Sequence, residues 1–314
     1  MFKPKQRHAV MGHSRAAIHP VLKYWDLYLM LLPALLFLLV YKYMPMYGII
    51  IAFKDFNIMQ GLLKSSWVGL QHFRELFMFD EFPRVIMNTL VISLMKLVFG
   101  FPIPIILALL LNELLLKRFK RVIQTITYVP HFISWVVVGG IVIDLLSPSS
   151  GIVNKLIQSL GFQPIFFMSE GQWFRWILVL SDSWKEAGWG AIIYLAALLG
   201  VNDELFQAAR VDGASRWRQI WHISLPCIRS TIVILLLLRI GHVFDAGFEQ
   251  ILVMYNATVY DVADIIDTYV FRIGLGQMKF GLTTAAGLFK SVIGCILLIV
   301  ANTLARRMGE DGIF

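Results

Sequence analysis

The sequence predicts an all-α integral membrane protein with six transmembrane helices. Of its 314 residues, 58% are hydrophobic and only 15% are charged, whereas soluble domains average about 25% charged residues. Apolar stretches long enough to cross a hydrocarbon core of about 30 Å recur along the whole chain, and none alternates as a barrel strand would. This composition excludes a soluble enzyme, and the two cysteines cannot form a disulfide framework.

The apolar stretches define six spans in order along the chain. They cover residues 28–51, 85–111, 123–146, 174–199, 231–255 and 282–304. The second span contains Pro102 and Pro104 and the third contains Pro130. Each proline permits a bend, which is either a static kink or a moving hinge.

Lysine and arginine are distributed unequally between the two sides of the membrane. With the N-terminus inside, the cytoplasmic segments hold 15 of these residues and the outer loops hold 7. Because positive residues are retained on the cytoplasmic side, we expect both termini in the cytoplasm. The net charge of +8 is then a topology signal, and no nucleic-acid partner is needed to explain it. We expect a basic tail over residues 1–24, one membrane domain over 25–308 and a short tail over 309–314.

The cytoplasmic loop between the fourth and fifth spans, residues 202–226, has a distinctive pattern. The polar pair Asn202-Asp203 offers a cap for a short helix whose first turn holds Glu204, and Asp212-Gly213 ends that helix. A second short helix follows, and Pro226 suits the first turn of the fifth span. Taken alone, this pattern predicts an amphipathic elbow on the inner leaflet.

The spacing within the loop resembles the signature of the permeases of binding-protein-dependent ABC importers. Gln207-Ala208-Ala209 is followed by Gly213 and later by Ile223-x-Leu225-Pro226, where that family has Glu-Ala-Ala, Gly and Ile-x-Leu-Pro. The six-span layout, Asp212-Gly213-Ala214 and residues 263–270 are similar to the carbohydrate-uptake branch of the family. Within that branch the chain is most similar to permeases for complex or acidic oligosaccharides, of the alginate and pectin types.

The resemblance implies the type I ABC importer permease architecture, in which this loop is a coupling helix that docks onto a separate ATPase subunit. Gln207 departs from the family's Glu, so the usual carboxylate contact cannot form there. Glu204, one turn earlier, or the partner permease could supply that contact, and we expect Gln207 to keep a neutral hydrogen bond. The implied coupling residues are Glu204, Gln207, Ala208, Ala209, Asp212, Gly213, Ile223, Leu225 and Pro226.

The resemblance also implies the partners of the chain. They are a second homologous permease, expected to form a heterodimer, two ATP-binding cassette subunits, a periplasmic or extracellular solute-binding protein, and an oligosaccharide. The expected location is a bacterial inner membrane that the chain crosses several times. The sequence contains no G-x-x-x-x-G-K-[S/T] phosphate loop, so we expect a non-catalytic subunit without a cofactor or metal. ATP and Mg would bind to the partner ATPases.

Ionisable and aromatic residues inside the spans are candidates for a substrate pathway, because intramembrane charges are costly and usually face a pathway or a partner. Interhelical salt bridges are the other explanation. In a hydrophilic cavity the tryptophans would stack on sugar rings, and the cations would suit a carboxylate-bearing substrate, although neighbouring acids argue against that substrate. Helical spacing places Asp182, Lys185 and Glu186 on one side of a helix, and it likewise places Asp245 and Glu249 on one face. The candidates are Lys96, Asp182, Trp184, Lys185, Glu186, Trp189, Arg239, Asp245, Glu249 and Lys290.

The loop pattern does not encode the solute, so other transport functions remain open. One is an ABC permease for amino acids, peptides or inorganic anions. Another is a proton-driven secondary transporter that uses the four intramembrane acids among the candidates, Asp182, Glu186, Asp245 and Glu249. A metal site at His242, Asp245 and Glu249 is disfavoured because no further ligands accompany them, and no catalytic motif favours an intramembrane enzyme.

Overall fold

The computed structural model describes residues 24–307 and Gly309 of the chain, nearly all of the ordered elements being helices. Apart from Tyr24 and Gly309, the two predicted tails lie outside the described residues, as do the three histidines of the N-terminal tail. The chain forms two compact units, Met1–Ile50 and Ile51–Phe314, and each is described by itself.

The first unit is a helical segment whose apolar side chains are exposed on every side. It contains α2 (Trp25–Leu38), a π-helical turn (Leu39–Tyr43) and most of a 3-10 helix (Met44–Phe53). None of the residues of α2 is buried. A helix that is apolar all round suits lipid rather than water, so this segment fits the first predicted span.

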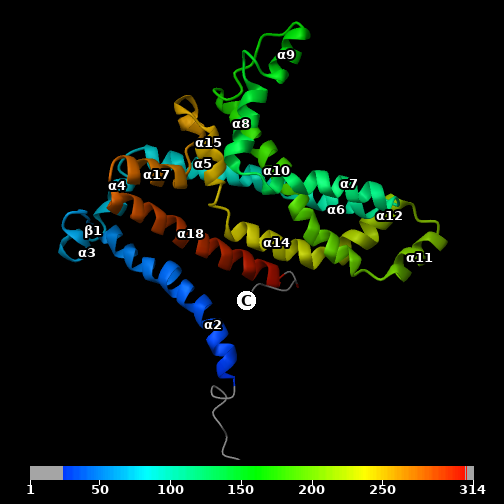
Figure 1. Ribbon diagram of the computed structural model, residues 1–314, viewed down its shortest axis with the longest axis horizontal. Helices are drawn as coiled ribbons and strands as arrows, with labels where there is room; N and C mark the ends of the chain where they lie inside the picture. Colours follow the sequence, from blue (N-terminus) through cyan, green and yellow to red (C-terminus); the bar gives the residue numbers. More distant parts are fainter. Residues whose placement is uncertain (1–23, 308, 310–314) are drawn as a thin grey trace, which may run out of the picture. The chain divides into compact units, whose positions relative to one another are not determined.

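The second unit begins with a small hairpin. Strand β1 (Lys54–Asp55) pairs antiparallel with β2 (Ser66–Trp67), and the short helix α3 (Gly61–Lys64) lies between them in sequence. Helix α4 (Gln71–Leu76) follows. Figure 1 shows this hairpin at one end of the unit and the segment around α11 at the opposite end.

The second predicted span is one continuous helical segment. It consists of α5 (Glu81–Met95), a π-helical turn (Lys96–Gly100) and α6 (Pro102–Asn112). The amide of Phe101 donates to the carbonyl of Lys96, five residues back, at 3.1 Å. This wider turn accommodates Pro102 and Pro104, which cannot donate backbone hydrogen bonds, without a sharp kink.

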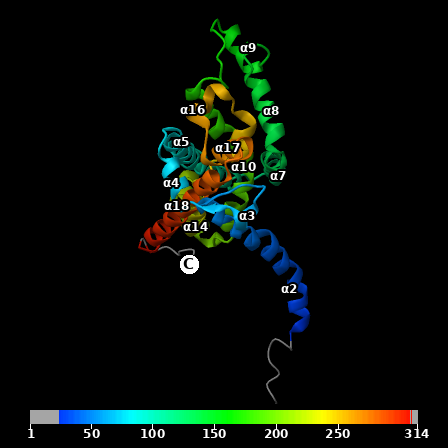
Figure 2. The ribbon, with the colours of Figure 1, turned by 90° about the vertical axis from the view of Figure 1, so that its left-hand side faces the viewer.

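The third predicted span is two helices rather than one. Helix α7 (Lys117–Tyr128) and a 3-10 turn (Val129–Phe132) meet α8 (Trp135–Leu146) at an angle of 104°. The expectation of a single helix over residues 123–146 is therefore wrong, because the chain turns sharply after Pro130 and becomes extended at Ile133. Helix α8 packs against α15, and Figure 2 shows α8 leading into the following helix α9 (Ile152–Ser159).

Helix α10 (Gly171–Leu199) has 29 residues without a break and contains the whole fourth predicted span. A bend of 74° then leads into α11 (Asp203–Val211). A Cβ atom on Gly188 would lie 2.0 Å from the carbonyl oxygen of Thr127. The backbones of α7 and α10 therefore touch at a point where only glycine fits.

The fifth predicted span is also interrupted. Helix α12 (Arg216–Gln219), a π-helical turn (Ile220–Ser224) and α13 (Leu225–Cys227) lead, through a bend of 62°, into α14 (Arg229–Gly241). The chain leaves helical geometry between Gly241 and α15 (Phe248–Met254). A single helix over residues 231–255 was the wrong expectation, because Gly247 adopts φ 98°, which no continuous helix permits.

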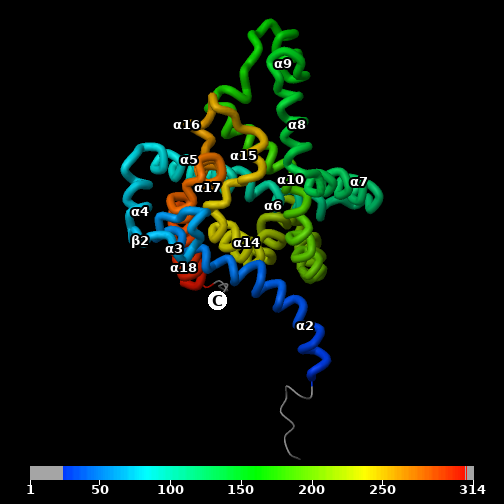
Figure 3. Tube along the Cα trace, turned by 60° about the vertical axis from the view of Figure 1, so that its left-hand side comes forward, coloured from blue at the N-terminus to red at the C-terminus, as the bar shows by residue number. Residues whose placement is uncertain are grey.

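The remaining elements close the unit. A 3-10 turn (Ala257–Val259), α16 (Tyr260–Ala263) and α17 (Ile266–Gly276) precede α18 (Phe280–Arg307), which contains the sixth predicted span. Helix α18 packs against both α14 and α17, and α10 packs against α6, as the tube in Figure 3 allows the reader to follow. Among the described residues, three unbroken helices and three bent pairs are long and apolar enough to cross a membrane, which gives six spans when each pair counts once.

Candidate functional site

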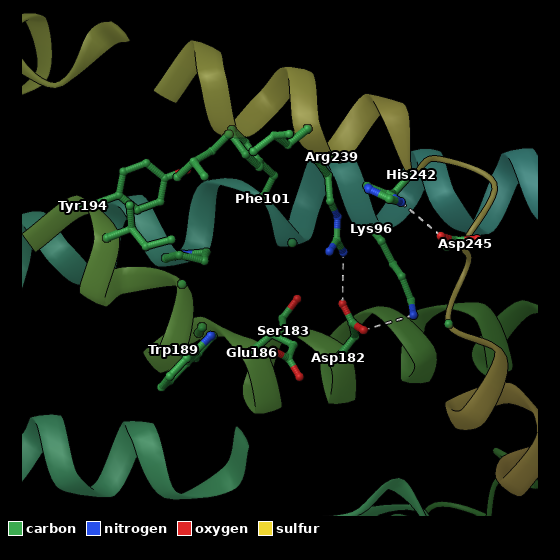
Figure 4. A pocket seen from close by; sticks show the side chains of 18 residues that line it. Lys96, Phe101, Asp182, Ser183, Glu186, Trp189, Tyr194, Arg239, His242 and Asp245 are labelled. Carbon is green, nitrogen blue, oxygen red and sulfur yellow. Dashed lines mark hydrogen bonds and ion pairs between the residues drawn. The ribbon is translucent and has the colours of Figure 1, made fainter. Parts of the chain in front are cut away.

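A cavity of about 520 Å³ lies between the π-helical turn of the second span, α10 and α14. Its wall is apolar in part, with Phe101, Tyr194 and Leu238, but charged side chains gather at one side (Figure 4). Six of the ten residues that the sequence proposes for a substrate pathway line this cavity. They are Lys96, Asp182, Glu186, Trp189, Arg239 and Asp245.

Asp182 is at the centre of the charged side. Its Oδ1 accepts a hydrogen bond from Lys96 Nζ at 3.1 Å, and its Oδ2 lies 3.5 Å from an Arg239 guanidinium nitrogen (Figure 4). Lys96 is only 3% exposed and also donates to Gln250 Oε1 at 2.5 Å. Gln250, which is fully buried, donates in turn to the carbonyl of Leu178 and to Ser181 Oγ, both at 2.8 Å. The network thus fixes α15 to α10 and to the second span.

A second cluster attaches the bend between α7 and α8 to α10. His131 Nδ1 lies 2.8 Å from Glu186 Oε2, and its ring stacks on Trp189 with centroids 4.6 Å apart and planes 2° from parallel. Lys185 is buried and donates to the carbonyl of His131 at 2.5 Å, and it also lies 3.5 Å from Glu186 Oε1. Lys185 therefore holds the bend between α7 and α8 against α10 and does not line the cavity.

Lys290 lies in a neighbouring cavity of about 530 Å³, lined also by Phe248 and Phe271. It forms an ion pair with Asp245, and it donates to Asp267 at 2.8 Å. Asp245 lines both cavities, so the interrupted part of the fifth span separates them.

Besides Lys185, two further candidates, Trp184 and Glu249, line neither cavity. Trp184 is 52% exposed, and its position two residues after Asp182 places it on the opposite side of α10. Glu249 is exposed on α15, whereas Asp245 precedes that helix. The expectation that these two acids share a helix face is wrong, because the turn before Gly247 separates them.

Gln250, Ser183 and His131 are among the residues of the site that were not singled out from the sequence. Gln250 and Ser183 are uncharged, so a search for intramembrane charges passes over them, although an amide in an apolar helix is itself a signal. His131 follows Pro130 directly, and its role depends on the angle between α7 and α8, which the sequence does not give.

Gly247→Ala is expected to destabilise the chain by about 1–3 kcal/mol, the typical cost of a residue held in a sparsely populated backbone conformation. A Cβ at this position would also lie 2.6 Å from Lys96 Nζ, so the buried network must shift. The thermal unfolding midpoint of the purified protein in detergent measures the effect. Gly287→Ala is the matched control, since a Cβ there meets nothing within 4 Å, and an equal loss in both variants would contradict the argument.

The loop between α10 and α13 has a helix that is exposed along its length. Asn202 caps α11 by accepting a hydrogen bond from the Glu204 amide at 3.0 Å, and none of the α11 side chains is buried. Gln207 and Ala208 are exposed and Ala209 is half-buried. The helix ends at Val211 with Asp212 as its C-cap, after which Gly213 adopts φ 73°. An exposed helix with small side chains on its surface permits close approach by another protein.

The other end of the loop is joined firmly to the fifth span. The Gln219 side chain donates to the carbonyl of Ala214 at 2.9 Å, which holds the turn after Gly213. Ile223 and Leu225 are half-buried and Pro226 lies in the first turn of α13. Ile223, Leu225 and Pro226 therefore lie where the loop joins the fifth span, and their coupling role stays a prediction.

The family model described as "Binding-protein-dependent transport system inner membrane component" matches residues 100–310. The chain belongs to this family. The resemblance seen in the loop is thereby confirmed, and the protein is a membrane component of a binding-protein-dependent transport system. The orientation of its termini stays a prediction.

Relatives of this permease match nearly its whole length. Protein LplB of Bacillus subtilis (strain 168) is 49% identical over 92% of this chain and 91% of its own. The polygalacturonan/rhamnogalacturonan transport system permease protein YteP of the same organism is 48% identical over 92% of this chain and 90% of its own.

Solved structures also match this permease. A chain of the bacterial alginate ABC transporter in complex with an alginate pentasaccharide-bound periplasmic protein has a TM-score of 0.87 and 42% identity, with 94% of this chain and 98% of that chain covered. A chain of a bacterial ABC transporter that imports the acidic polysaccharide alginate has a TM-score of 0.86 and 43% identity, with 92% and 97% covered. The predicted type I ABC permease fold is confirmed.

Proposed function

We propose that this permease forms half of the transmembrane pathway of an ATP-driven importer for an oligosaccharide, including oligosaccharides that contain uronates. The observation that carries the proposal is full-length likeness to a polygalacturonan/rhamnogalacturonan permease and to an alginate transporter. The cavity supports it, because Trp189 and Phe101 provide apolar surface for sugar rings beside a group of hydrogen-bonding charges.

The partners follow from the family and from the surfaces of the chain. A second homologous permease completes the pathway, and a solute-binding protein delivers the sugar from outside. Two ATP-binding cassette subunits bind ATP and Mg and hydrolyse ATP, while this subunit catalyses no reaction. The exposed helix α11 is the contact for one ATPase, with both termini of the permease in the cytoplasm.

The geometry supports alternating access as the mechanism. When ATP binding brings the two ATPases together, each would draw one α11 with it. Helix α10 continues from the loop to Asp182 without interruption, so the displacement reaches the cavity wall. The interrupted helices, α7–α8 and α14–α15, are the places where the bundle can change shape around the substrate.

The proposal is tested by reconstituting the permease into vesicles with its partner subunits and binding protein. ATP-dependent uptake of trigalacturonate is expected with the full set, and none by this chain alone without nucleotide. Uptake by the isolated chain that collapses with an uncoupler would favour the proton-driven transporter instead. Uptake of an amino acid or a peptide but of no oligosaccharide would assign the importer to another solute.

A further inference from the structure

Four cationic side chains were predicted as candidates to bind an acidic substrate, and three of them are already paired with other groups of this chain. Lys96 and Lys185 are buried, and each has two acceptors from within the chain. Lys290 is paired with two carboxylates, those of Asp245 and Asp267. A substrate carboxylate would have to break several short hydrogen bonds to reach any of these ammonium groups.

Arg239 differs from the other three cations. Its side chain is 48% exposed and faces the cavity from α14. Within the described part of the chain its guanidinium has one ion pair, at 3.5 Å from Asp182 Oδ2, and no side-chain hydrogen bond. The guanidinium therefore retains donors in a forked arrangement that matches a carboxylate.

Asp182 can release Arg239 without becoming an unpaired charge. Its other oxygen, Oδ1, keeps the hydrogen bond from Lys96 at 3.1 Å. The large cost of leaving a carboxylate alone in a low-dielectric site is thus avoided when the arginine turns away. Asp182 acts as a counter-ion that is present when the cavity is empty and can be exchanged.

The neighbouring hydroxyl of Ser183 is a second unsatisfied group. Ser183 is 7% exposed and lines the same cavity, and its Oγ has no hydrogen-bond partner among the described residues. A Cβ on Gly100 would approach this oxygen to 3.2 Å, so the glycine leaves room beside it. A buried hydroxyl without a partner is costly, and a ligand oxygen in the cavity would satisfy it.

We propose that Arg239 and Ser183 form a carboxylate-binding subsite for a uronate residue, in which the substrate carboxylate displaces Asp182 from Arg239. The subsite rests on the proposed transport function and adds the residues that select the acid. Because Asp182 competes for the same guanidinium, binding stays weak enough for the sugar to leave, as passage through a pathway requires.

The test compares two probes on the permease–ATPase complex without binding protein, by equilibrium dialysis at millimolar concentration. The probes are trigalacturonate and its methyl ester, which lacks the negative charges. Arg239→Gln is expected to weaken trigalacturonate binding by about 10-fold or more, as for the loss of a charged hydrogen-bonding partner, and to leave the methyl ester within about two-fold. Asp182→Asn is expected to strengthen trigalacturonate binding several-fold, because the competitor is removed.

The two substitutions are expected to change trigalacturonate affinity in opposite directions. If the two residues had only a structural role, both substitutions would weaken binding. Lys290→Gln is the matched control, since it removes an equal charge outside this subsite and is expected to affect both probes alike. Equal weakening by Arg239→Gln and Asp182→Asn, an unchanged affinity in both, or no binding by the wild type would overturn the subsite. Failure of the proposed function is seen separately, as a wild-type importer that takes up no oligosaccharide with ATP.

Discussion

Lys96→Met is expected to lower the free energy of unfolding by about 3–5 kcal/mol, the range for removing one partner of a buried ion pair. Lys96 is almost fully buried and supplies the shorter of the two contacts to Asp182, while Gln250 Oε1 also depends on it. Methionine has a similar length and keeps the packing, so the loss reports the charge. The midpoint of thermal unfolding in detergent measures it.

The control for this substitution is Lys64→Met, at an exposed lysine on the short helix α3, which should leave the midpoint unchanged. The double variant Lys96→Met with Asp182→Asn should recover part of the loss, because neither charge is then left alone. A single variant as stable as the control would show that the buried network does not hold the second span to α10.

Ala208→Trp is expected to reduce ATP-driven uptake by about 30-fold or more while the permease still folds. Ala208 is exposed on α11, so a larger side chain meets nothing within the chain. At a surface in close contact with an ATPase, the added bulk would prevent docking, and a central interface substitution costs about 2 kcal/mol or more. Uptake into vesicles and copurification of the ATPase measure the two consequences.

Gln158→Trp controls for the bulk of the new side chain, since Gln158 is exposed on α9, far along the chain from the coupling loop. That variant should assemble and transport normally. Full uptake by Ala208→Trp would show that α11 is not the docking surface, and the assignment of the remaining coupling residues would fail with it.

Hydropathy predicted the membrane class and the number of spans because it measures length and apolarity. The fourth and sixth spans came out as single helices, α10 and α18, since nothing in the structure interrupts them. The fifth did not: hydropathy averaged over a whole span does not detect the short break at residues 242–247, which includes His242 and Asp245 and ends at Gly247 with its positive φ. Such a turn is fixed by tertiary contacts, here by Lys96 and Gln250.

The sequence identified the charged residues of the site but not their roles. Asp182 and Glu186 were expected on one face of a helix, and both line the cavity because α10 is regular between them. Lys185 was expected on the same face, yet it donates to the carbonyl of His131. That carbonyl lies near α10 only because the chain bends between α7 and α8. A charged residue in an apolar span can therefore be recognised from the sequence as part of a site. Its partner cannot, because the partner depends on where the other spans bend.

The unbroken geometry of α10 fixes the rotational phase between its two ends. An α-helix turns by about 100° for each residue, so one inserted or deleted residue between Asp182 and Asn202 would swing α11 by that angle about the axis of α10. Longer loops elsewhere in the protein can accommodate an inserted or deleted residue. The link between α10 and α11, residues 200–202, is too short to compensate for the rotation. Chimeric permeases must consequently exchange α10 and α11 as a single block.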